Sequence, residues 1–155
     1  MPVWGYSVRE YDPDRAVKCS ARELKISPKA ATEICRKLRG MRLDSAKELL
    51  EAVAKKKRAI AFRRYKKEVP HRSLDEGWYA GRYPVKAAKH FLFLLEELEA
   101  NAEYKGLDVD RLRIVHAAAQ RGMKTRRVVS RAMGRASPAY NTLVHIELMG
   151  YEVAA

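Results

Sequence analysis

The C-terminal third of the chain contains the feature that most restricts its possible folds. Two segments, Leu112–Ala118 and Thr142–Met149, have the patterns of β-strands, and Val144, Ile146 and Leu148 alternate with other residues in the second. The stretch between them is rich in Arg and Lys and poor in large apolar side chains. An unstructured loop of that length is uncommon inside a compact domain, so we expect the two strands to continue into one long hairpin.

The predicted hairpin is an arm that extends beyond the protein core. Alignment of Val115 with Ile146 places its turn near Ser130 and Arg131. Roughly ten residues of each strand then lie outside the core, or about 30 Å at the usual rise per residue. A two-stranded ribbon is marginal alone in water because it buries little apolar surface. We therefore expect the arm to be ordered by the molecule that it enters, and its Arg and Lys content indicates nucleic acid.

The charge of the chain is unevenly distributed. Its 155 residues include 32 Lys and Arg and 19 Asp and Glu, which gives a formal net charge of +13. Segments 55–67 and 121–135 contain basic residues and no acid, whereas segment 96–110 contains six acids and one Lys. Clustered basic residues repel one another and form the electrostatic footprint of a polyanion-binding protein.

Composition excludes several other classes of protein. A hydrophobic content of 47% is sufficient for a packed core and argues against disorder. The apolar run Phe91–Leu95 is much shorter than the roughly 20 residues that cross a bilayer. Segment Met1–Arg15 does not resemble a secretory signal, and two cysteines do not make a disulfide scaffold. We therefore expect a single intracellular domain with no membrane insertion.

The first part of the chain predicts a strand followed by a helix. Segment Ala16–Leu24 alternates between apolar and polar residues, which indicates a half-buried strand. Ser27 and Pro28 then provide an N-cap and a proline at the first helical position. Gly40 follows the helical pattern where a C-terminal glycine is expected.

Two more helices are predicted, with a loop between them. The second helix starts near Asp44, where Ser45 and Glu48 have the spacing of a capping box. Segment Lys66–Pro84 contains several prolines and glycines and no period, so it is predicted to be a loop. Segment Pro84–Tyr104 has a wide apolar stripe at helical spacing and predicts the third helix.

The sequence contains no convincing catalytic or metal-binding motif. Cys19 and Cys35 form no CxxC pair, and the four histidines lack metal-ligand spacing. The hairpin register places His116 nearly opposite His145, a conceivable half-site for a metal, although ordinary strand histidines are favoured. No phosphate-binding glycine loop or nucleophile elbow is present. We therefore predict that the protein is not an enzyme and has no cofactor and no metal site.

Short segments along almost the whole chain resemble one protein family. They are Val17–Ser20, Ser27–Ala30, Leu38–Met41, Ala61–Tyr65, Gly81–Pro84, Ala100–Asp110, Arg131–Arg135 and His145–Glu147. Together they make the chain similar to the archaeal and eukaryotic type of the universal L-twenty-two family of large-subunit ribosomal proteins. Segments Met1–Arg15 and Lys66–Tyr83 depart from the shorter bacterial members of that family.

The resemblance implies an α+β fold, with three helices packed on a small antiparallel sheet and a long β-hairpin arm. It implies one ribosomal-protein domain, residues 1–155, with a globular core of 1–119 and 142–155 and an arm of 120–141 whose tip is near Met123–Arg135. In the family, the arm threads through large-subunit ribosomal RNA and lines the nascent-peptide exit tunnel. The implied partners are therefore this rRNA, neighbouring ribosomal proteins and the nascent polypeptide, and the implied location is the cytoplasmic ribosome.

These interpretations assign two overlapping sets of residues. The residues expected to bind RNA are Lys18, Arg22, Lys55, Lys56, Lys57, Arg58, Arg63, Arg64, Tyr65, Lys66, Lys67, Arg72, Trp78, Arg82, Tyr83, Arg121, Lys124, Arg126, Arg127, Arg131 and Arg135. The residues that the resemblance places on the tunnel wall are Met123, Lys124, Arg126, Arg127, Val128, Arg131, Ala132, Met133, Gly134 and Arg135.

Alternatives remain at this stage. Tyr65, Trp78 and Tyr83 are interleaved with Arg residues and could stack on unpaired bases, but packing beneath a long loop is an equal interpretation. A DNA-architectural protein could use a β-arm whose proline, here Pro138, wedges into a minor groove. An RNA-processing enzyme with an unrecognised site is the third alternative. We favour RNA over DNA because the chain shows no spare apolar face for the dimer that a DNA-bending protein would normally need.

Overall fold

The computed structural model describes residues 5–8, 11–74 and 77–153 of the chain. The elements follow the order β1 (Ala16–Leu24), α1 (Pro28–Leu38), α2 (Leu43–Ala54), β2 (Ile60–Ala61), β3 (Gly81–Arg82), α3 (Val85–Lys105), the 3-10 helix η1 (Val109–Arg111), β4 (Leu112–Ser130) and β5 (Ala136–Glu152). Among the described residues, no helix is both long and apolar enough to cross a membrane.

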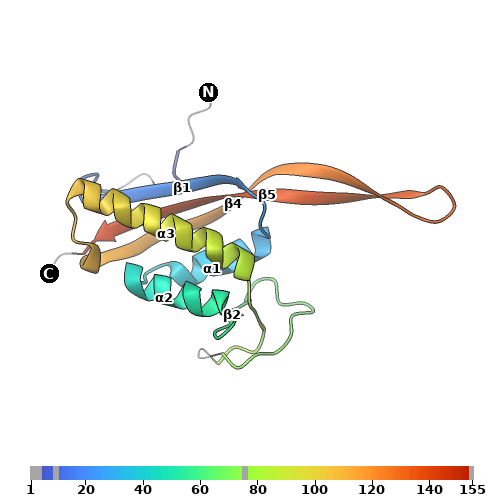
Figure 1. The fold of residues 1–155 in the computed structure, drawn as a ribbon, viewed down its shortest axis with the longest axis horizontal. Coiled ribbons are helices and arrows are strands. Elements are labelled where there is room, and N and C mark those ends of the chain that lie inside the picture. Colours follow the sequence, from blue (N-terminus) through green and yellow to red (C-terminus); the bar gives the residue numbers. More distant parts are fainter. Residues whose placement is uncertain (1–4, 9–10, 75–76, 154–155) are drawn as a thin grey trace.

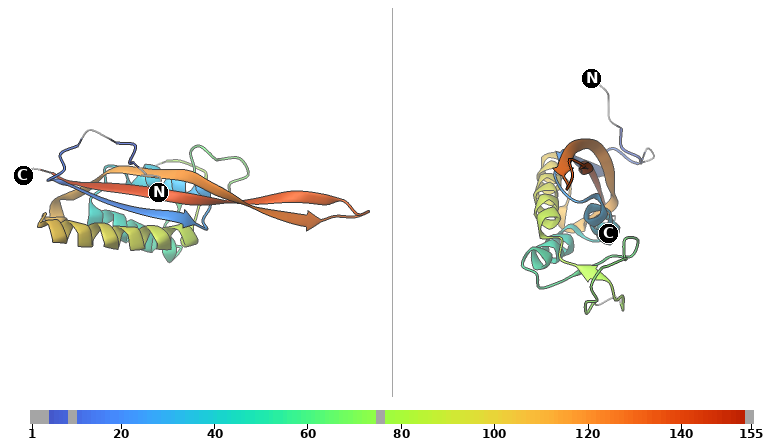
Figure 2. Two further views of the ribbon diagram at one scale, coloured as in Figure 1. Left: turned by 90° about the horizontal axis from the view of Figure 1, so that it is seen from above. Right: turned by 90° about the vertical axis from the view of Figure 1, so that its right-hand side faces the viewer.

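The three helices pack on one side of a three-stranded antiparallel sheet (Figures 1 and 2). The strand order is β1-β5-β4, so β5 lies in the centre and β1 and β4 each pair with it. Ile34 of α1, Phe91 of α3 and Ile146 of β5 are each 0% exposed in the core between the layers. This architecture confirms the predicted α+β fold.

The predicted ends of the elements agree closely with the structure. Strand β1 has the predicted bounds, and Pro28 begins α1. Helix α3 ends at Lys105, and its C-cap Gly106 has a φ of 72°, a left-handed conformation that glycine adopts without the steric cost of a Cβ atom.

The predicted capping box at the start of α2 is wrong. The helix begins at Leu43 with Arg42 as its N-cap, and no side chain caps it. Ser45 and Glu48 therefore both lie inside the helix. The apolar stripe begins with the fully buried Leu43, so burial of this side chain fixes the start of the helix more strongly than the local polar pattern.

Strands β4 and β5 continue well beyond the rest of the sheet and form a twisted two-stranded ribbon (Figures 1 and 2). The last pair between β1 and β5 is Leu24 with Val144, and beyond it β5 pairs with β4 alone. The ribbon closes through the turn Arg131–Arg135, in which Met133 and Gly134 have φ values of 56° and 68°. We call residues 120–141 the arm and the remainder the body.

The predicted register of the hairpin is wrong. Ile146 pairs with Ala119 and not with Val115, and the turn lies beyond Ser130. Two bulges in β4, one at Val115 and one at Gly122–Met123, each insert a residue that has no partner in β5. Val115 is consequently 53% exposed, and Met123 lies near the base of the arm rather than near its tip.

The corrected register separates the two histidines that were expected to face each other. His116 pairs with Met149, and His145 pairs with Gln120. The conceivable metal half-site is therefore not formed. His116 instead lies 3.8 Å from a carboxylate oxygen of Glu147, and the side-chain amide of Gln120 donates a hydrogen bond of 3.1 Å to the other oxygen.

A close contact fixes the base of the arm. A Cβ atom on Gly122 would lie 2.6 Å from Nε2 of His145, so a larger residue here would force the ring of His145 to move. The Nδ1 atom of the same histidine accepts a hydrogen bond of 3.1 Å from the backbone N–H of Glu23. Glu23 has a φ of 54° and lies at the bulge of β1. His145 therefore contacts both neighbouring strands where the arm leaves the sheet.

Candidate nucleic-acid interface

The arm exposes almost all of its side chains and carries no negative charge. Every residue from 123 to 136 is exposed, and Met133 at the turn is 95% exposed. No Asp or Glu occurs between residues 120 and 141. The structure thus brings the predicted basic residues of the arm together on a ribbon that contributes little to the core.

Strand alternation distributes the positive charge over both faces of the ribbon. Arg126 pairs with Tyr140 across the strands, and the next residue, Arg127, points to the opposite face. Arg131 and Arg135 flank the turn, where the N–H of the first donates a hydrogen bond of 2.8 Å to the carbonyl of the second. Within the described residues, no ion pair joins the arm to a carboxylate. The positive charge of the arm is therefore not compensated by carboxylates among the described residues.

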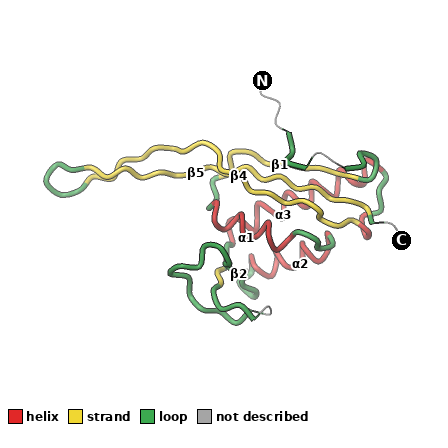
Figure 3. Tube along the Cα trace, turned by 180° about the vertical axis from the view of Figure 1, so that it is seen from behind, coloured by secondary structure: helices red, strands yellow, loops and turns green. Residues whose placement is uncertain are grey.

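The second basic segment, residues 55–67, lies at the end of the body from which the arm departs. Figures 1 and 3 show that α2 ends and α3 begins near this end, next to the loop that contains β2 and β3. Lys55 binds Glu51 through a hydrogen bond of 3.0 Å between exposed side chains. The residues Lys56, Lys57, Arg58, Arg63, Arg64, Lys66 and Lys67 are exposed. Two basic regions that are distant in sequence thus share one end of the molecule.

The loop between β2 and β3 packs its predicted aromatic residues against the body. Tyr65 and Trp78 are half-buried against the core, and the indole N–H of Trp78 donates a hydrogen bond of 3.0 Å to the carbonyl of Phe62. Trp78 also stacks on Tyr79, which is 44% exposed, with ring centroids 5.0 Å apart. Tyr65 and Trp78 therefore pack in part beneath the loop, and part of each side chain stays accessible.

A hollow of about 310 Å³ is lined by several of the residues that the sequence predicts to bind RNA. Tyr65, Lys67, Arg82 and Tyr83 line it together with Lys29 from α1, which the charge-run analysis did not identify. The guanidinium of Arg82 donates a hydrogen bond of 3.1 Å to the carbonyl of Glu68. The hollow thus presents three cations beside the rings of two tyrosines and of Phe62.

Three other residues that were predicted to bind RNA, Lys18, Arg22 and Arg72, do not line this hollow. Lys18 is half-buried, with its ammonium 3.8 Å from the ring centroid of Tyr11 and hydrogen-bonded to the hydroxyl of that tyrosine. Arg22 is exposed at the bulge of β1. The guanidinium of Arg72 lies over the ring of Tyr83. The structure does not bring Lys18 to the basic end of the body.

Acidic side chains lie mainly at the opposite end of the body. Helix α3 runs away from the base of the arm (Figure 1), and Glu96 and Glu103 are exposed in its second half. Glu99 forms an ion pair with Lys47 of α2. The molecule therefore has a basic end, from which the arm extends, and a more acidic end.

The separation of charge and the exposed, acid-free arm are typical of polyanion-binding proteins. The model of the family described as "Ribosomal protein L22p/L17e" matches residues 19–150. A protein of Cenarchaeum symbiosum named "Large ribosomal subunit protein uL22" is 52% identical over 152 residues, which cover 98% of this chain and 99% of that protein.

Two other relatives of the same name give similar results. The protein of Methanopyrus kandleri is 53% identical over 149 residues, or 94% of each chain. The protein of Archaeoglobus fulgidus is 52% identical over 144 residues, or 93% of each chain. The chain belongs to the L22p/L17e family of ribosomal proteins, as the resemblance of its short segments predicts.

Proposed function

We propose that this protein is a structural component of the large ribosomal subunit that binds large-subunit rRNA through its arm and the basic end of its body. The observation that carries the proposal is the arm, which is exposed, positively charged and without a carboxylate. Phosphates supply the missing counter-charge. Most of the binding free energy then comes from release of condensed counterions, so the affinity depends strongly on salt.

The orientation of the body follows from the same charges. The basic end faces RNA, whereas Glu96, Glu103 and their neighbours face solvent or a basic neighbouring protein, because carboxylates beside phosphates would repel them. The contacts of the arm are mainly to phosphates, ribose hydroxyls and RNA shape, since side chains cannot read the deep, narrow major groove of A-form RNA.

The tip of the arm is proposed to line the nascent-peptide exit tunnel. Family membership and the extension of the ribbon beyond the body support this assignment. The turn contains the small residues Ala132 and Gly134, which allow close approach of backbone to RNA or leave room for a passing polypeptide. We propose no catalytic role for any residue of the chain.

The proposal is tested by shortening the arm in the observed register. Replacing residues 126–140 with Asn-Gly joins the paired residues Thr125 and Asn141 by a two-residue turn. We expect the affinity for transcribed large-subunit rRNA to fall, and the salt slope to decrease by roughly 0.7–0.9 for each phosphate that the shortened arm no longer neutralises. Binding is measured over a series of salt concentrations, and incorporation is measured by co-sedimentation with large subunits at high salt.

A full-length control separates charge from length. Replacement of Arg126, Arg127, Arg131 and Arg135 with Gln keeps the ribbon and removes its charge, so it should reduce the salt slope to a similar extent. Unchanged rRNA binding in both variants would overturn the proposal. Tighter binding of duplex DNA than of rRNA by the natural protein would instead favour the DNA-architectural alternative.

A further inference from the structure

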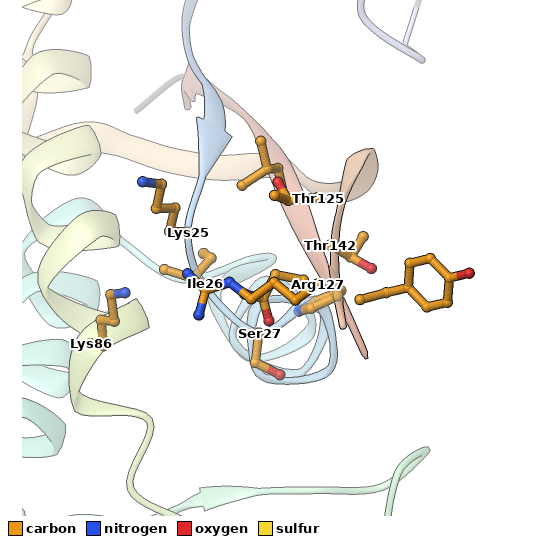
Figure 4. Close-up of a pocket in the computed structure, with 11 residues that line it drawn as sticks. Lys25, Ile26, Ser27, Lys86, Thr125, Arg127 and Thr142 are labelled. Carbon is orange, nitrogen blue, oxygen red and sulfur yellow. The ribbon is translucent and has the colours of Figure 1, made fainter. Parts of the chain in front are cut away.

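A groove of about 570 Å³ opens where β1 leaves the sheet and β5 continues into the arm (Figure 4). One wall is the connection from β1 to α1, residues 25–28. The other wall is the base of the arm, formed by residues 125 and 127 of β4 and 140–143 of β5. Lys86 in the first turn of α3 lines a third side. The corrected hairpin register is what brings these segments together.

Three cations from three elements meet at this groove. Figure 4 shows Lys25, Lys86 and Arg127 projecting from the β1–α1 connection, α3 and β4 around the same opening. Within the described residues, none of the three has a hydrogen bond or an ion pair to a carboxylate, and no acid lines the groove. An anion placed between them would be attracted from three sides.

The other residues that line the groove add neutral hydrogen-bonding groups and apolar surface to the three cations. Ser27, Thr125, Asn141 and Thr142 supply hydroxyl and amide groups, and the hydroxyl of Ser27 makes no capping bond to α1. The apolar and aromatic side chains of the lining are Ile26 (6% exposed), Pro28, Leu143 (8% exposed) and Tyr140 (50% exposed). The groove thus combines cations, neutral hydrogen-bonding groups and apolar surface at one place.

We propose that this groove holds one unpaired nucleotide of RNA at the base of the arm. The cations bind its phosphates, the hydroxyl and amide groups bind the ribose hydroxyls, and the base covers the apolar surface. The volume lies within the range of small-ligand pockets, which suits one extruded nucleotide. The proposal rests on the proposed function, because the arm must enter RNA for a nucleotide to reach its base.

The other candidate occupant is an extended peptide. Beyond Val144, the edge of β5 that paired with β1 has no strand partner among the described residues, and such an edge can accept an added strand. Three unpaired cations and no acid favour a phosphodiester over a peptide. The peptide is therefore kept as an outcome of the test.

The first test compares lysines in matched positions. Lys86 lines the groove, whereas Lys89, one turn further along the exposed face of α3, does not. We expect Lys86→Gln and Lys25→Gln each to lower the salt slope of binding to transcribed large-subunit rRNA by about 0.7, the value for one contact to single-stranded nucleic acid. Lys89→Gln should leave the slope unchanged. Equal slopes in all three variants would overturn the proposal.

The second test identifies the occupant in assembled large subunits. The photo-crosslinking residue p-benzoylphenylalanine is placed at Asn141, which is exposed and lines the groove, and at Glu103 as a control. We expect the probe at Asn141 to crosslink to a single region of rRNA and the probe at Glu103 to form no RNA crosslink. A crosslink from position 141 to protein alone would overturn the proposal in favour of a peptide, and the absence of any crosslink there would also overturn it.

The failures of the two proposals are distinguishable. Full rRNA binding by the shortened-arm protein would contradict the proposed ribosomal function itself. Weakened binding by the shortened-arm protein, together with natural salt slopes for Lys25→Gln and Lys86→Gln, would contradict only the nucleotide site.

Discussion

The body and the arm share strands β4 and β5 but use them in opposite ways. In the body, Leu112, Ile114 and Leu148 of these strands are each 0% exposed. In the arm, Val128 on the same β4 strand is 73% exposed. Burial of apolar side chains stabilises the body, whereas the arm contributes positive charge and extends beyond the body. One pair of strands thus supports folding at one end and forms the proposed RNA-binding surface at the other, and the two contributions can be separated by experiment.

The largest expected difference between the body and the arm is in the rate at which cysteine thiols react with a labelling reagent. Cys19 and Cys35 are both buried, and burial raises the pKa of each thiol to about 12, so little reactive thiolate forms. If these thiols react only through global unfolding, they should be protected by a factor of about 10³ or more relative to the denatured chain. A Val128→Cys thiol on the arm should react like a free thiol.

The reaction of a disulfide reagent with each thiol, followed over time, measures this difference. The same reagent in denaturant is the control, since all thiols should then react at similar rates. Fast labelling of Cys19 or Cys35 in the native protein would show that the body opens locally and that its contrast with the arm is smaller than the burial implies.

Cavity formation should give the next largest effect, and it is confined to the body. Phe91→Ala removes a fully buried ring and should lower the free energy of unfolding by about 3–5 kcal/mol. The matched change is Phe93→Ala on the same helix, where the ring is 60% exposed. It should change stability by about 0.5 kcal/mol or less. Urea unfolding of both variants checks the comparison, and equal destabilisation by the two changes would contradict it.

The junction between the regions should show an intermediate effect. Gly122→Ala places a methyl group against the ring of His145 and should destabilise the protein by about 1–3 kcal/mol, the usual range for overpacking. His145→Ala removes the obstructing ring, so the double variant should be less destabilised than the two single variants combined. Urea unfolding of the four proteins in this cycle measures the coupling, and additive effects would show that the ring of His145 is not what restricts Gly122.

The smallest expected effect on stability comes from the largest deletion. Replacement of residues 126–140 with Asn-Gly removes side chains that are exposed or, at Ser137 and Ala139, half-buried, and it leaves the buried part of β4 and β5 intact. The free energy of unfolding should therefore change by less than about 0.5 kcal/mol. Removal of four like charges should stabilise the protein slightly at low salt. Thermal unfolding at two salt concentrations measures both effects, and unfolding of the shortened protein at room temperature would show that the arm belongs to the core.

The sequence allowed prediction of the elements whose local patterns agree with their packing. The alternation in β1 and the apolar stripe of α3 predicted both elements nearly to the residue. The arm was also predicted, because a long basic stretch between two strand patterns is seldom an unstructured loop inside a compact domain, which leaves a continuous hairpin as the simplest fold. The same reasoning could not locate the bulges at Val115 and Gly122–Met123, since a bulge depends on tertiary contacts such as that of His145 with Gly122.

The candidate site was predictable only where its charges are consecutive in sequence. The runs 55–67 and 121–135 were found from composition, and the arm, which contains the second run, departs from the end of the body where the first run lies. Lys25 and Lys86 are isolated lysines without a sequence signal, and only the fold brings them beside Arg127. The ammonium of Lys18 lies over the ring of Tyr11, a contact that no periodicity in the sequence indicates.

The central position of β5 has a consequence for synthesis of the protein. Strands β1 and β4 are both edge strands that pair with β5, and β5 follows every other element in the sequence. Pairing of Ala16 with Tyr151 must therefore close a loop of almost the whole chain, which slows folding relative to local contacts. Until β5 leaves the ribosome that makes it, the helices have no completed sheet to cover. Each new copy of this protein is thus expected to complete its sheet only after β5 has been translated.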